Sequence, residues 1–348
     1  MHSHTRSHTS IFGLSWSPAN VALTILLTLL FLIFLLLFLT LTAPPAQGQT
    51  YRILYNFTGG QDGAYVDSLI MDRAGNLYGT TRAGGSLTFG TLFKFTRGFL
   101  APLYNFTGTG SGLFAFPWHY LVFGPDGNLY GTEKYGGLGW GTVFKLRPPA
   151  TACNSVLCPW IQTVLYRFSG AYDGANPTGQ LSFDRQGNIY GTTLLGGSGG
   201  DCNPSPCGNV YELTPGRSGW TEIVIYNFTG REGAYPTSGI ILDADGNLFG
   251  STLGGGDLGD GTVFRLSPWG SGWEYSTIYE FQASDDGYYP HGNLIFDASG
   301  NLYGSTGWGA RVVRVRCSTL SVLETGPSTC FIPLQDRLLP TYPNSLIW

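Results

Sequence analysis

The sequence predicts an all-β fold made of repeated four-stranded units. A hexapeptide of the type Gly-Asn-Leu-Tyr-Gly-Thr occurs five times, beginning at Gly75, Gly127, Gly187, Gly246 and Gly300. Its asparagines are spaced by 52, 60, 59 and 54 residues, which is typical of a repeat array. The 348 residues include 52 glycines and 15% aromatic but only 11% charged residues, which suits turn-rich sheets with rings packed between them. Four antiparallel strands per repeat, arranged radially, predict a β-propeller.

Each repeat contains the same four strands in the same order. The first is an aromatic strand, at residues 54–57, 103–106, 165–168, 225–228 and 278–281. The second is an apolar run ending in Asp at residues 69–72, 181–184, 240–243 and 294–297, whereas the second copy has Gly124 at that place. The hexapeptide is the third, and residues 90–95, 141–146, 208–213 and 261–266 are the fourth. Side chains within these runs alternate with period two, and Gly, Asn, Asp and Pro lie at the ends of the runs, as is typical of strands.

The junction Asp-x-x-Gly-Asn predicts a tight hairpin turn between the second and third strands. The Asp side chain can accept local backbone N–H groups, and Gly tolerates a positive φ. Four of the five repeats have one such Asp each, so these residues cannot share one metal ion. We interpret them as turn residues: Asp72, Asp184, Asp243 and Asp297.

The order of the strands predicts a ring of five four-stranded blades closed by the N-terminal strand. Residues 52–57 form an outermost strand with no inner strands before it, and residues 294–315 form inner strands with no outermost strand after them. We therefore expect residues 52–57 to pair with 311–315, which would remove the open sheet edges. The expected organisation is a leader over residues 1–48, a propeller over 49–315 and an irregular tail over 316–348.

The N-terminal residues have the pattern of a secretory signal. An apolar run spans residues 21–42 and is followed by Ala46-Gln47-Gly48, which has small residues where a signal peptidase cleaves. The alternative is an uncleaved membrane anchor, because 22 apolar residues can span a bilayer. Either reading predicts an exported protein that is periplasmic, cell-surface or extracellular, and only the anchor predicts a membrane partner.

Export also affects the interpretation of the cysteines. Cys153 and Cys158 have the same spacing as Cys202 and Cys207, and both pairs lie in insertions between strands. In an oxidising compartment we expect two local disulfides, 153–158 and 202–207. The alternative is a zinc site made by the four thiolates, which the spacing allows.

The repeated pattern Asp-x-x-Gly-Asn-Leu-Tyr-Gly-Thr-Thr, then Gly-Gly, then Gly-Thr-Val-Phe-Lys-Leu, resembles the GloVer repeat of exported bacterial proteins. The resemblance covers residues 51–315, and the chain is more distantly similar to NHL-type propellers. The GloVer resemblance implies a propeller and an exported location. It implies no activity and no catalytic residue.

The candidate ligand-binding residues are two histidines and four carboxylates. His119 and His291 follow Pro117 and Pro290 in the loop before the innermost strand, so both are expected near one end of the central channel. Exposed loop residues are the simpler interpretation. The carboxylates precede Gly in the loops after the aromatic strands, where they could ring the channel or merely form turns. They are Asp62, Asp173, Glu232 and Asp286.

Two classes of function remain after the charge and the motifs are considered. A net charge of −4 argues against a nucleic-acid partner. The sequence has no phosphate-binding loop and no metal-binding His pair, so no cofactor, metal or catalytic residue is expected. We favour a non-catalytic binding module for an extracellular protein or polysaccharide. The alternative is a propeller enzyme, a polysaccharide lyase or glycoside-acting hydrolase, with a site in the central channel.

Overall fold

The computed structural model describes residues 18–42, 52–107, 120–149, 160–198, 202, 206–283, 286–308 and 313–315. Its contacts divide the chain into two units, Met1–Ile53 and Leu54–Trp348. The first unit holds one helix, α1, and the second unit holds the strands β1 to β22. The all-β prediction is therefore confirmed for the repeats, whereas the exact domain boundaries stay a prediction.

The helix α1 spans Pro18–Thr42 and contains the apolar run of the sequence. The Thr28 hydroxyl donates to the carbonyl oxygens of Thr24 and Ile25 at 3.0 and 2.9 Å, so this polar group has its hydrogen-bond partners within the helix. In the described part of the chain, no helix meets the length and hydropathy expected of a membrane span. Cleavage of the leader and anchoring by it both stay predictions.

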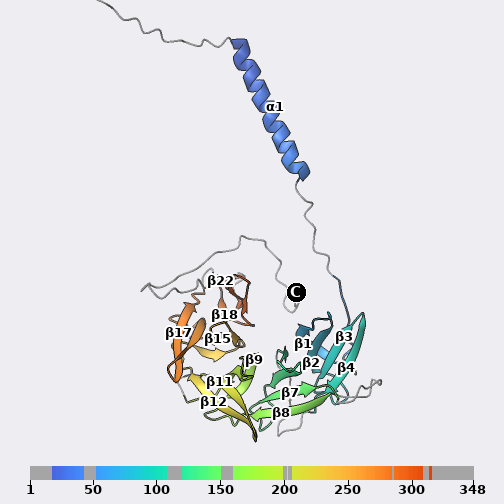
Figure 1. Cartoon of the computed structure of the whole chain (residues 1–348), viewed down its shortest axis with the longest axis vertical. Helices are drawn as coiled ribbons and strands as arrows, with labels where there is room; N and C mark the ends of the chain where they lie inside the picture. The colour runs from blue at the N-terminus through green and yellow to red at the C-terminus, as the bar shows by residue number, and fades with distance from the viewer. Residues whose placement is uncertain are drawn as a thin grey trace, which may run out of the picture. The chain divides into compact units, whose positions relative to one another are not determined.

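The strands form five successive antiparallel groups, which we call sheets 1 to 5 (Figure 1). Sheet 1 contains β1 (Ala64–Met71), β2 (Leu77–Ala83), β3 (Thr91–Thr96) and β4 (Phe99–Asn105). Sheet 2 contains β5 (Val122–Phe123), β6 (Leu129–Glu133), β7 (Thr142–Arg147) and β8 (Ile161–Arg167). Sheet 3 contains β9 (Ala175–Phe183), β10 (Ile189–Leu195), β11 (Asn209–Gly216) and β12 (Gly219–Asn227).

Sheets 4 and 5 have a divided first strand. Sheet 4 contains β13 (Ala234–Pro236), β14 (Ile241–Leu242), β15 (Leu248–Gly254), β16 (Thr262–Trp269) and β17 (Gly272–Glu280). What we call sheet 5 consists of two separately hydrogen-bonded groups: β18 (Tyr288–Pro290) with β21 (Thr306–Trp308), and β19 (Ile295–Phe296) with β20 (Leu302–Gly304) and β22 (Val313–Val315). In Figure 1 the aromatic strands β4, β8, β12 and β17 lie on the outside of the group of sheets. The predicted order of strands within a repeat is thus confirmed.

The hairpin turns form as the Asp-x-x-Gly-Asn pattern predicts. Asp184 Oδ1 accepts the backbone N–H groups of Gln186 and Asn188 at 2.9 and 2.8 Å, and its Oδ2 accepts the Asn188 side chain at 2.8 Å. Gly187 in the same turn has a φ of 88°. In the second repeat Gly124 replaces the Asp, and Asp126 takes over by binding Asn128 and Tyr130.

Neighbouring sheets pack through aromatic rings that lie over glycines. Phe264 of β16 pairs in register with Gly250, where an added Cβ would lie 2.5 Å from its ring. Phe228 of the preceding sheet packs against Phe264 with ring centroids 5.2 Å apart. The same contact recurs between Phe106 and Phe144 at 5.8 Å. The glycine of the hexapeptide therefore makes room for a ring, which explains its recurrence.

Backbone hydrogen bonds also join consecutive sheets. Asn176, Tyr235 and Tyr289 have φ values of 56–57°, which non-glycine residues rarely adopt. Each donates its backbone N–H to a carbonyl oxygen of the preceding sheet: Trp140, Cys207 and Asp260, at 2.6 to 2.8 Å. The unusual backbone is thus compensated by a bond between sheets. Tyr65 of sheet 1 has the same conformation, with a φ of 57°.

Closure of the ring is not confirmed by the described residues. Residues 52–57 form no strand there, and β22 pairs with β20. Tyr55 and Phe57 instead pack on Phe95 and Phe93 of sheet 1, with ring centroids 6.4 and 5.0 Å apart. The contact between Phe57 and Phe93 repeats the contact between consecutive sheets described above. The five-blade closed ring stays a prediction.

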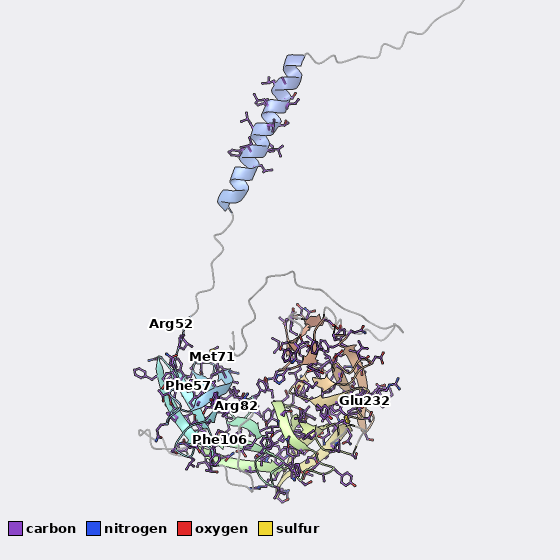
Figure 2. All side chains as sticks on the ribbon, turned by 180° about the vertical axis from the view of Figure 1, so that it is seen from behind. Arg52, Phe57, Met71, Arg82, Phe106 and Glu232 are labelled. Carbon is purple, nitrogen blue, oxygen red and sulfur yellow. A yellow bond between two sulfur atoms is a disulfide. The ribbon has the colours of Figure 1, made fainter. Side chains whose placement is uncertain are left out.

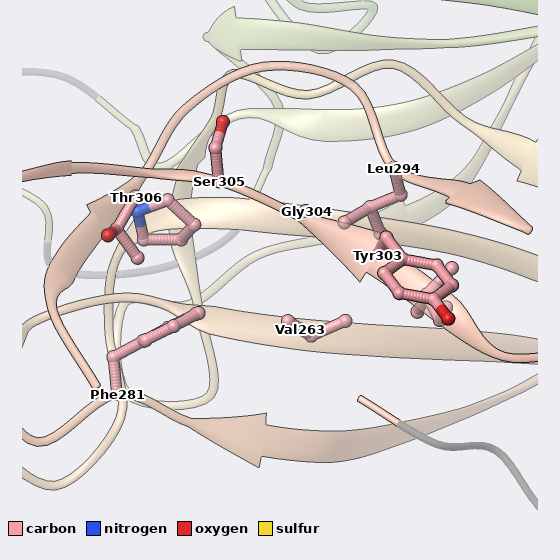
Figure 3. A pocket seen from close by; sticks show the side chains of 9 residues that line it. Val263, Phe281, Leu294, Tyr303, Gly304, Ser305 and Thr306 are labelled. Carbon is pink, nitrogen blue, oxygen red and sulfur yellow. The ribbon is translucent and has the colours of Figure 1, made fainter. Parts of the chain in front are cut away.

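Sheet 5 lacks the aromatic ring that the other sheets place over the hexapeptide glycine. Gly304 pairs with Val313, whereas the equivalent glycines pair with Phe93, Phe144, Tyr211 and Phe264. A small cavity lies beside Gly304 and is also lined by Phe281 and Leu294 (Figure 3).

One predicted disulfide is present in the described residues. Cys202 and Cys207 are bonded, with their Cα atoms 5.3 Å apart. This excludes these two sulfurs as ligands of the alternative zinc site. Cys153 and Cys158 lie outside the described residues, so the second predicted disulfide stays a prediction.

Candidate functional site

The four predicted carboxylates are each bound within their own loop. Asp62 Oδ2 accepts the Tyr55 hydroxyl at 3.1 Å and the Thr58 backbone N–H at 2.8 Å. The same pattern of a tyrosine hydroxyl and a backbone N–H recurs for the other three carboxylates, Asp173, Glu232 and Asp286. In the described ranges, no group of three or more His, Cys, Asp or Glu side chains could hold a metal ion. These hydrogen bonds explain the four carboxylates as turn residues. Contact of the carboxylates with a ligand stays a prediction.

These bonds also affect the ionisation of the carboxylates. Burial alone would raise the pKa of Asp62, but its bonds from Thr58 and Tyr55 outweigh burial and lower it. The pKa of Glu232 is likewise lowered, because hydrogen bonds from Thr229 and Tyr226 outweigh partial burial. Asp62 and Glu232 are therefore held ionised as acceptors of fixed turns.

Of the two predicted histidines, the structure describes only His291. It follows β18, donates its backbone N–H to Ser305 at 3.0 Å and accepts the Ser305 hydroxyl at 2.8 Å on its carbonyl oxygen. The residue is exposed. His119 lies outside the described residues, so the predicted meeting of the two histidines stays a prediction.

Arg82 and Asp67, which the sequence analysis did not single out, form an ion pair whose charges influence the pKa of His291. Arg82 Nε donates to Asp67 Oδ1 at 2.9 Å, and Nη2 donates to the same oxygen. The Asp67 side chain is only 5% exposed, whereas that of Arg82 is 39% exposed. The pair thus has a buried carboxylate and a guanidinium that water can reach. In Figure 2 Arg82 lies on the side of sheet 1 that faces the other sheets.

A β-bulge positions Asp67. The ladder between β1 and β2 pairs Val66 with Thr81 and Ser68 with Thr80, so Asp67 is an extra residue in the inner strand. Bulges re-aim a side chain and are frequent beside functional sites. Here the bulge brings the carboxylate of Asp67 to Arg82 at the end of β2.

The charges of this pair reach residues of two other sheets. Burial lowers the pKa of Lys134, and the positive charge of Arg82 lowers it further. Burial raises the pKa of Tyr120, and Asp67 adds to that shift. Loss of water around its ring lowers the pKa of His291, with Arg82 acting in the same direction. We call Asp67, Arg82, Tyr120, Lys134 and His291 the axial cluster, since sheets 1, 2 and 5 contribute to it.

Sheets 3, 4 and 5 meet through a different set of residues. Asn293 Oδ1 accepts the backbone N–H groups of Gln180 and Gly239 at 3.3 and 3.1 Å, and its Nδ2 donates to Gln180 Oε1 at 3.0 Å. Asn293 comes from sheet 5, Gln180 from sheet 3 and Gly239 from sheet 4. One side of the centre is therefore closed by amide hydrogen bonds, and the other side carries the charges.

A signal in the sequence does distinguish the two sides. The position two residues after the hexapeptide threonine or serine is Arg82, Lys134, Leu194, Leu253 or Gly307. Two adjacent repeats thus have a cation where two others have leucine. A second position also differs between the repeats. It follows Val66 in the first repeat, where it is Asp67, and Pro290 in the fifth repeat, where it is His291. Aligning these positions would have identified most of the cluster.

Comparison with known proteins agrees with the repeat pattern. The family model of the Gloeobacter/Verrucomicrobia repeat matches residues 40–201 and 140–312. No curated protein matches the chain. Among solved structures, the chain is similar to the PQQ-bound form of an aldose sugar dehydrogenase from Streptomyces coelicolor. The identity is 16%, the TM-score is 0.51, and 84% of this chain and 86% of that chain are covered.

Two further solved structures are less similar. Virginiamycin B lyase from Staphylococcus aureus is 16% identical with a TM-score of 0.47, over 78% of this chain and 71% of that chain. The extracellular domain of a putative one-component system from B. thetaiotaomicron is 17% identical with a TM-score of 0.46, over 76% of this chain but 32% of that chain. Identities this low indicate the fold alone. The family match, which extends over most of the chain, shows that this protein belongs to the Gloeobacter/Verrucomicrobia repeat family.

Proposed function

We propose that the protein is an exported β-propeller that acts as a non-catalytic binding module and takes its ligand at the axial cluster. The observation that carries the proposal is the ion pair between the partly exposed Arg82 and the buried Asp67, whose charges also influence the pKa values of Lys134 and His291. Charged residues gathered at the end of a repeat array are placed for recognition and not for packing.

The exposed side chains at the same end support binding. Tyr65 lies between the register pairs that flank Arg82 and is 77% exposed. Tyr289 has the same place in sheet 5 and is also exposed. Exposed aromatic rings beside polar groups are typical of binding surfaces.

The test is a binding and cleavage screen of the purified repeats. Residues 49–348 would be immobilised and exposed to a panel of acidic and neutral polysaccharides and to envelope proteins, with each soluble product analysed for cleavage. We expect saturable binding that a variant with Tyr65→Ala and Tyr289→Ala weakens by about tenfold, equivalent to about 1.4 kcal/mol. Turnover of any panel member would contradict the non-catalytic assignment.

A second candidate function, a polysaccharide lyase, is favoured by one observation. His291 lies within electrostatic reach of Arg82 and Asp67, and its lowered pKa keeps the ring neutral, as a base must be. In that function His291 would abstract a proton from the sugar, and Arg82 would stabilise the negative charge that develops. His291→Ala would then reduce the rate of unsaturated-product formation by a hundredfold or more. An unchanged rate would exclude His291 as the base.

We further propose that five blades close into a ring. Tyr65 has the backbone conformation through which Asn176, Tyr235 and Tyr289 donate to the preceding sheet. Its own preceding sheet in a closed ring is sheet 5. The register of Phe93 with Pro102 in sheet 1 predicts that Ile53 faces Val313. Cysteines at positions 53 and 313 should cross-link under mild oxidation, whereas a control pair at 53 and 315 should not.

Export is supported by the leader pattern and by the disulfide between Cys202 and Cys207. We propose that the leader is cleaved after Gly48. N-terminal sequencing of protein from the native envelope tests this: an N-terminus at Gln49 is expected. An intact Met1 would establish the anchor instead.

A further inference from the structure

We infer that sheet 5 binds the neutral sugar rings of a polysaccharide on three aromatic side chains, Tyr288, Tyr289 and Trp308, which we call the aromatic platform. The inference rests on the proposed function and specifies its ligand. It depends on four observations: the contact between the rings, their exposure, the small residues that other sheets have instead, and an opening beside the rings.

The register of β18 and β21 assembles the platform. Tyr288 and Trp308 are directly opposite each other in this antiparallel pair, so their side chains leave the same face of it. Tyr289 has a φ of 56°, and its ring centroid lies 5.0 Å from that of Tyr288. This backbone conformation is held by the N–H of Tyr289, which donates to the Asp260 carbonyl oxygen at 2.8 Å. The fold therefore gathers three rings at one end of sheet 5.

The rings of the platform are accessible to a ligand. Trp308 is 65% exposed and Tyr289 is 38% exposed. In the sequence, the four residues 309–312 separate Trp308 from Val313, whereas nine residues separate the equivalent Ala83 and Phe93 of sheet 1. Less chain is therefore available in sheet 5 to cover this end of the sheet.

The other sheets do not need large rings at this position. Their equivalent pairs each contain an alanine: Ala64 with Ala83, Ala175 with Leu195, and Ala234 with Gly254. In sheets 3 and 4 this alanine is almost completely buried. Alanine thus satisfies the packing of the repeat, and the exposed aromatic pair of sheet 5 calls for an explanation other than folding. Exposed aromatic residues gathered in one place are typical of binding surfaces.

Gly307 leaves an opening beside the platform. The equivalent position has a long side chain in the other four sheets: Arg82, Lys134, Leu194 and Leu253. The φ of Gly307 lies outside the left-handed region, so the backbone conformation does not require glycine there. An added Cβ would lie 3.2 Å from the Tyr289 carbonyl oxygen and 3.8 Å from His291 Cβ. The missing side chain therefore leaves the place between Tyr289 and His291 open, next to the axial cluster.

The residues around the platform favour a neutral sugar. Residues 286–308 contain no lysine or arginine. The exposed polar residues beside the rings are His291 and Ser305, and the residue that holds Tyr289 is the acidic Asp260. A sugar ring has an apolar face that packs on aromatic rings and hydroxyl groups that bond to carboxylate, hydroxyl and imidazole groups. An acidic polymer would meet the negative charge of Asp260 without a cation from this segment.

The experiment measures binding of dextran, galactomannan and polygalacturonate to the full chain in detergent micelles by titration calorimetry. We expect at least one of the two neutral polymers to bind, with an affinity that does not change with salt. We expect polygalacturonate to bind roughly tenfold more weakly or not at all. Failure of both neutral polymers to bind would overturn the inference, and so would equally tight binding of polygalacturonate.

Variants assign the binding to the platform. The double variant Tyr288→Ala, Trp308→Ala installs the alanine pair of sheet 1, so it should fold, and we expect it to weaken binding by roughly tenfold or more. Trp308→Phe keeps a ring and should retain most of the affinity. Gly307→Leu installs the residue of sheets 3 and 4 and should block the opening with a similar loss. Trp269→Ala is the matched control, because Trp269 is 73% exposed in the hairpin between β16 and β17.

The variants also separate the failure of this inference from the failure of the proposed function. Unchanged neutral-polymer binding in the double variant and in Gly307→Leu, with folding verified by circular dichroism, would overturn the inference but retain a binding module. An equal loss with Trp269→Ala would show a general effect of exposed rings and would also overturn it. Absence of binding to every polysaccharide and every envelope protein would refute the proposed function itself.

Discussion

The two sides of the centre use equivalent repeat positions for opposite purposes. Between sheets 3, 4 and 5, Asn293 joins Gln180 and Gly239, and Thr178 donates to the Pro236 carbonyl oxygen at 3.0 Å. Between sheets 5, 1 and 2, the equivalent strands carry the charged axial cluster. The first arrangement satisfies each polar group and stabilises the sheets. The second places charges where packing would be served by leucine, which is the usual sign of function at the expense of stability.

The largest expected effect comes from breaking the hydrogen-bonded side. Asn293→Leu removes three hydrogen bonds and leaves the backbone N–H groups of Gln180 and Gly239 without their acceptor. We expect a loss of about 2–4 kcal/mol in the free energy of unfolding, measured by urea denaturation. Gln180→Met, which removes only the side-chain bond, should cost less. Equal costs would show that the backbone bonds to Asn293 contribute little.

A smaller effect is expected from breaking the ion pair on the charged side. Asp67→Ala leaves Arg82 with water as its replacement partner, because the guanidinium is partly exposed. Arg82→Ala instead leaves a buried carboxylate. We expect losses of about 1 kcal/mol for the first and about 2–3 kcal/mol for the second. The reverse order, by thermal or urea unfolding, would contradict the burial assigned to Asp67.

A third substitution, Lys134→Leu, should make the charged side more like the uncharged, hydrogen-bonded side. Lys134→Leu removes a buried charge whose pKa is lowered by burial and by Arg82. We expect the unfolding free energy to rise by on the order of 1 kcal/mol while ligand binding falls. Leu194→Lys is the matched inverse change in sheet 3 and should lower stability without creating binding. A loss of stability in Lys134→Leu would mean that the lysine is a structural residue.

The periodic features of the fold were predictable from the recurring pattern, whereas the site is marked in the sequence only by residues that depart from that pattern. The strands, their order and the Asp184 turn follow from local patterns that recur in each repeat. The axial cluster consists of departures from the repeat, and its members lie far apart in the sequence, in sheets 1, 2 and 5. Asp67 additionally depends on a bulge, at which it is the extra residue of the inner strand, whereas the inner strand of sheet 3 has its irregularity between Thr178 and Ser182. His291 was identified because histidines are few.

The second repeat illustrates the same limit on a smaller scale. Its missing Asp at Gly124 was visible in the sequence, but the compensation by Asp126 was not. Asp126 lies inside the turn, binds Asn128 and Tyr130, and pairs with Lys145. Since the compensating carboxylate is displaced by two residues, an alignment of the repeats does not match it with Asp184. Only the three-dimensional turn shows that the two serve one role.

The smallest expected effect is the pH dependence that His291 gives to the charged side. Its pKa is lowered from 6.5 by loss of water and by Arg82, with Asp67 opposing. Below pH 6.5 the unfolded chain therefore takes up a proton more readily than the folded chain, so this group costs stability as the pH falls.

The effect of His291 on stability has to be measured with a variant, because a second group titrates over the same pH range and changes the stability in the opposite direction. Burial and the charge of Asp173 raise the pKa of Glu222 to about 7, so its protonation favours the folded state as the pH falls toward 4.5. His291→Gln leaves Glu222 unchanged. The difference between wild type and His291→Gln, measured by urea unfolding at each pH, therefore isolates the histidine. We expect the variant to become more stable relative to wild type below pH 6.5. A variant that keeps the wild-type pH dependence would show that His291 is not part of the charged side. The cluster would then consist of Arg82, Lys134, Asp67 and Tyr120.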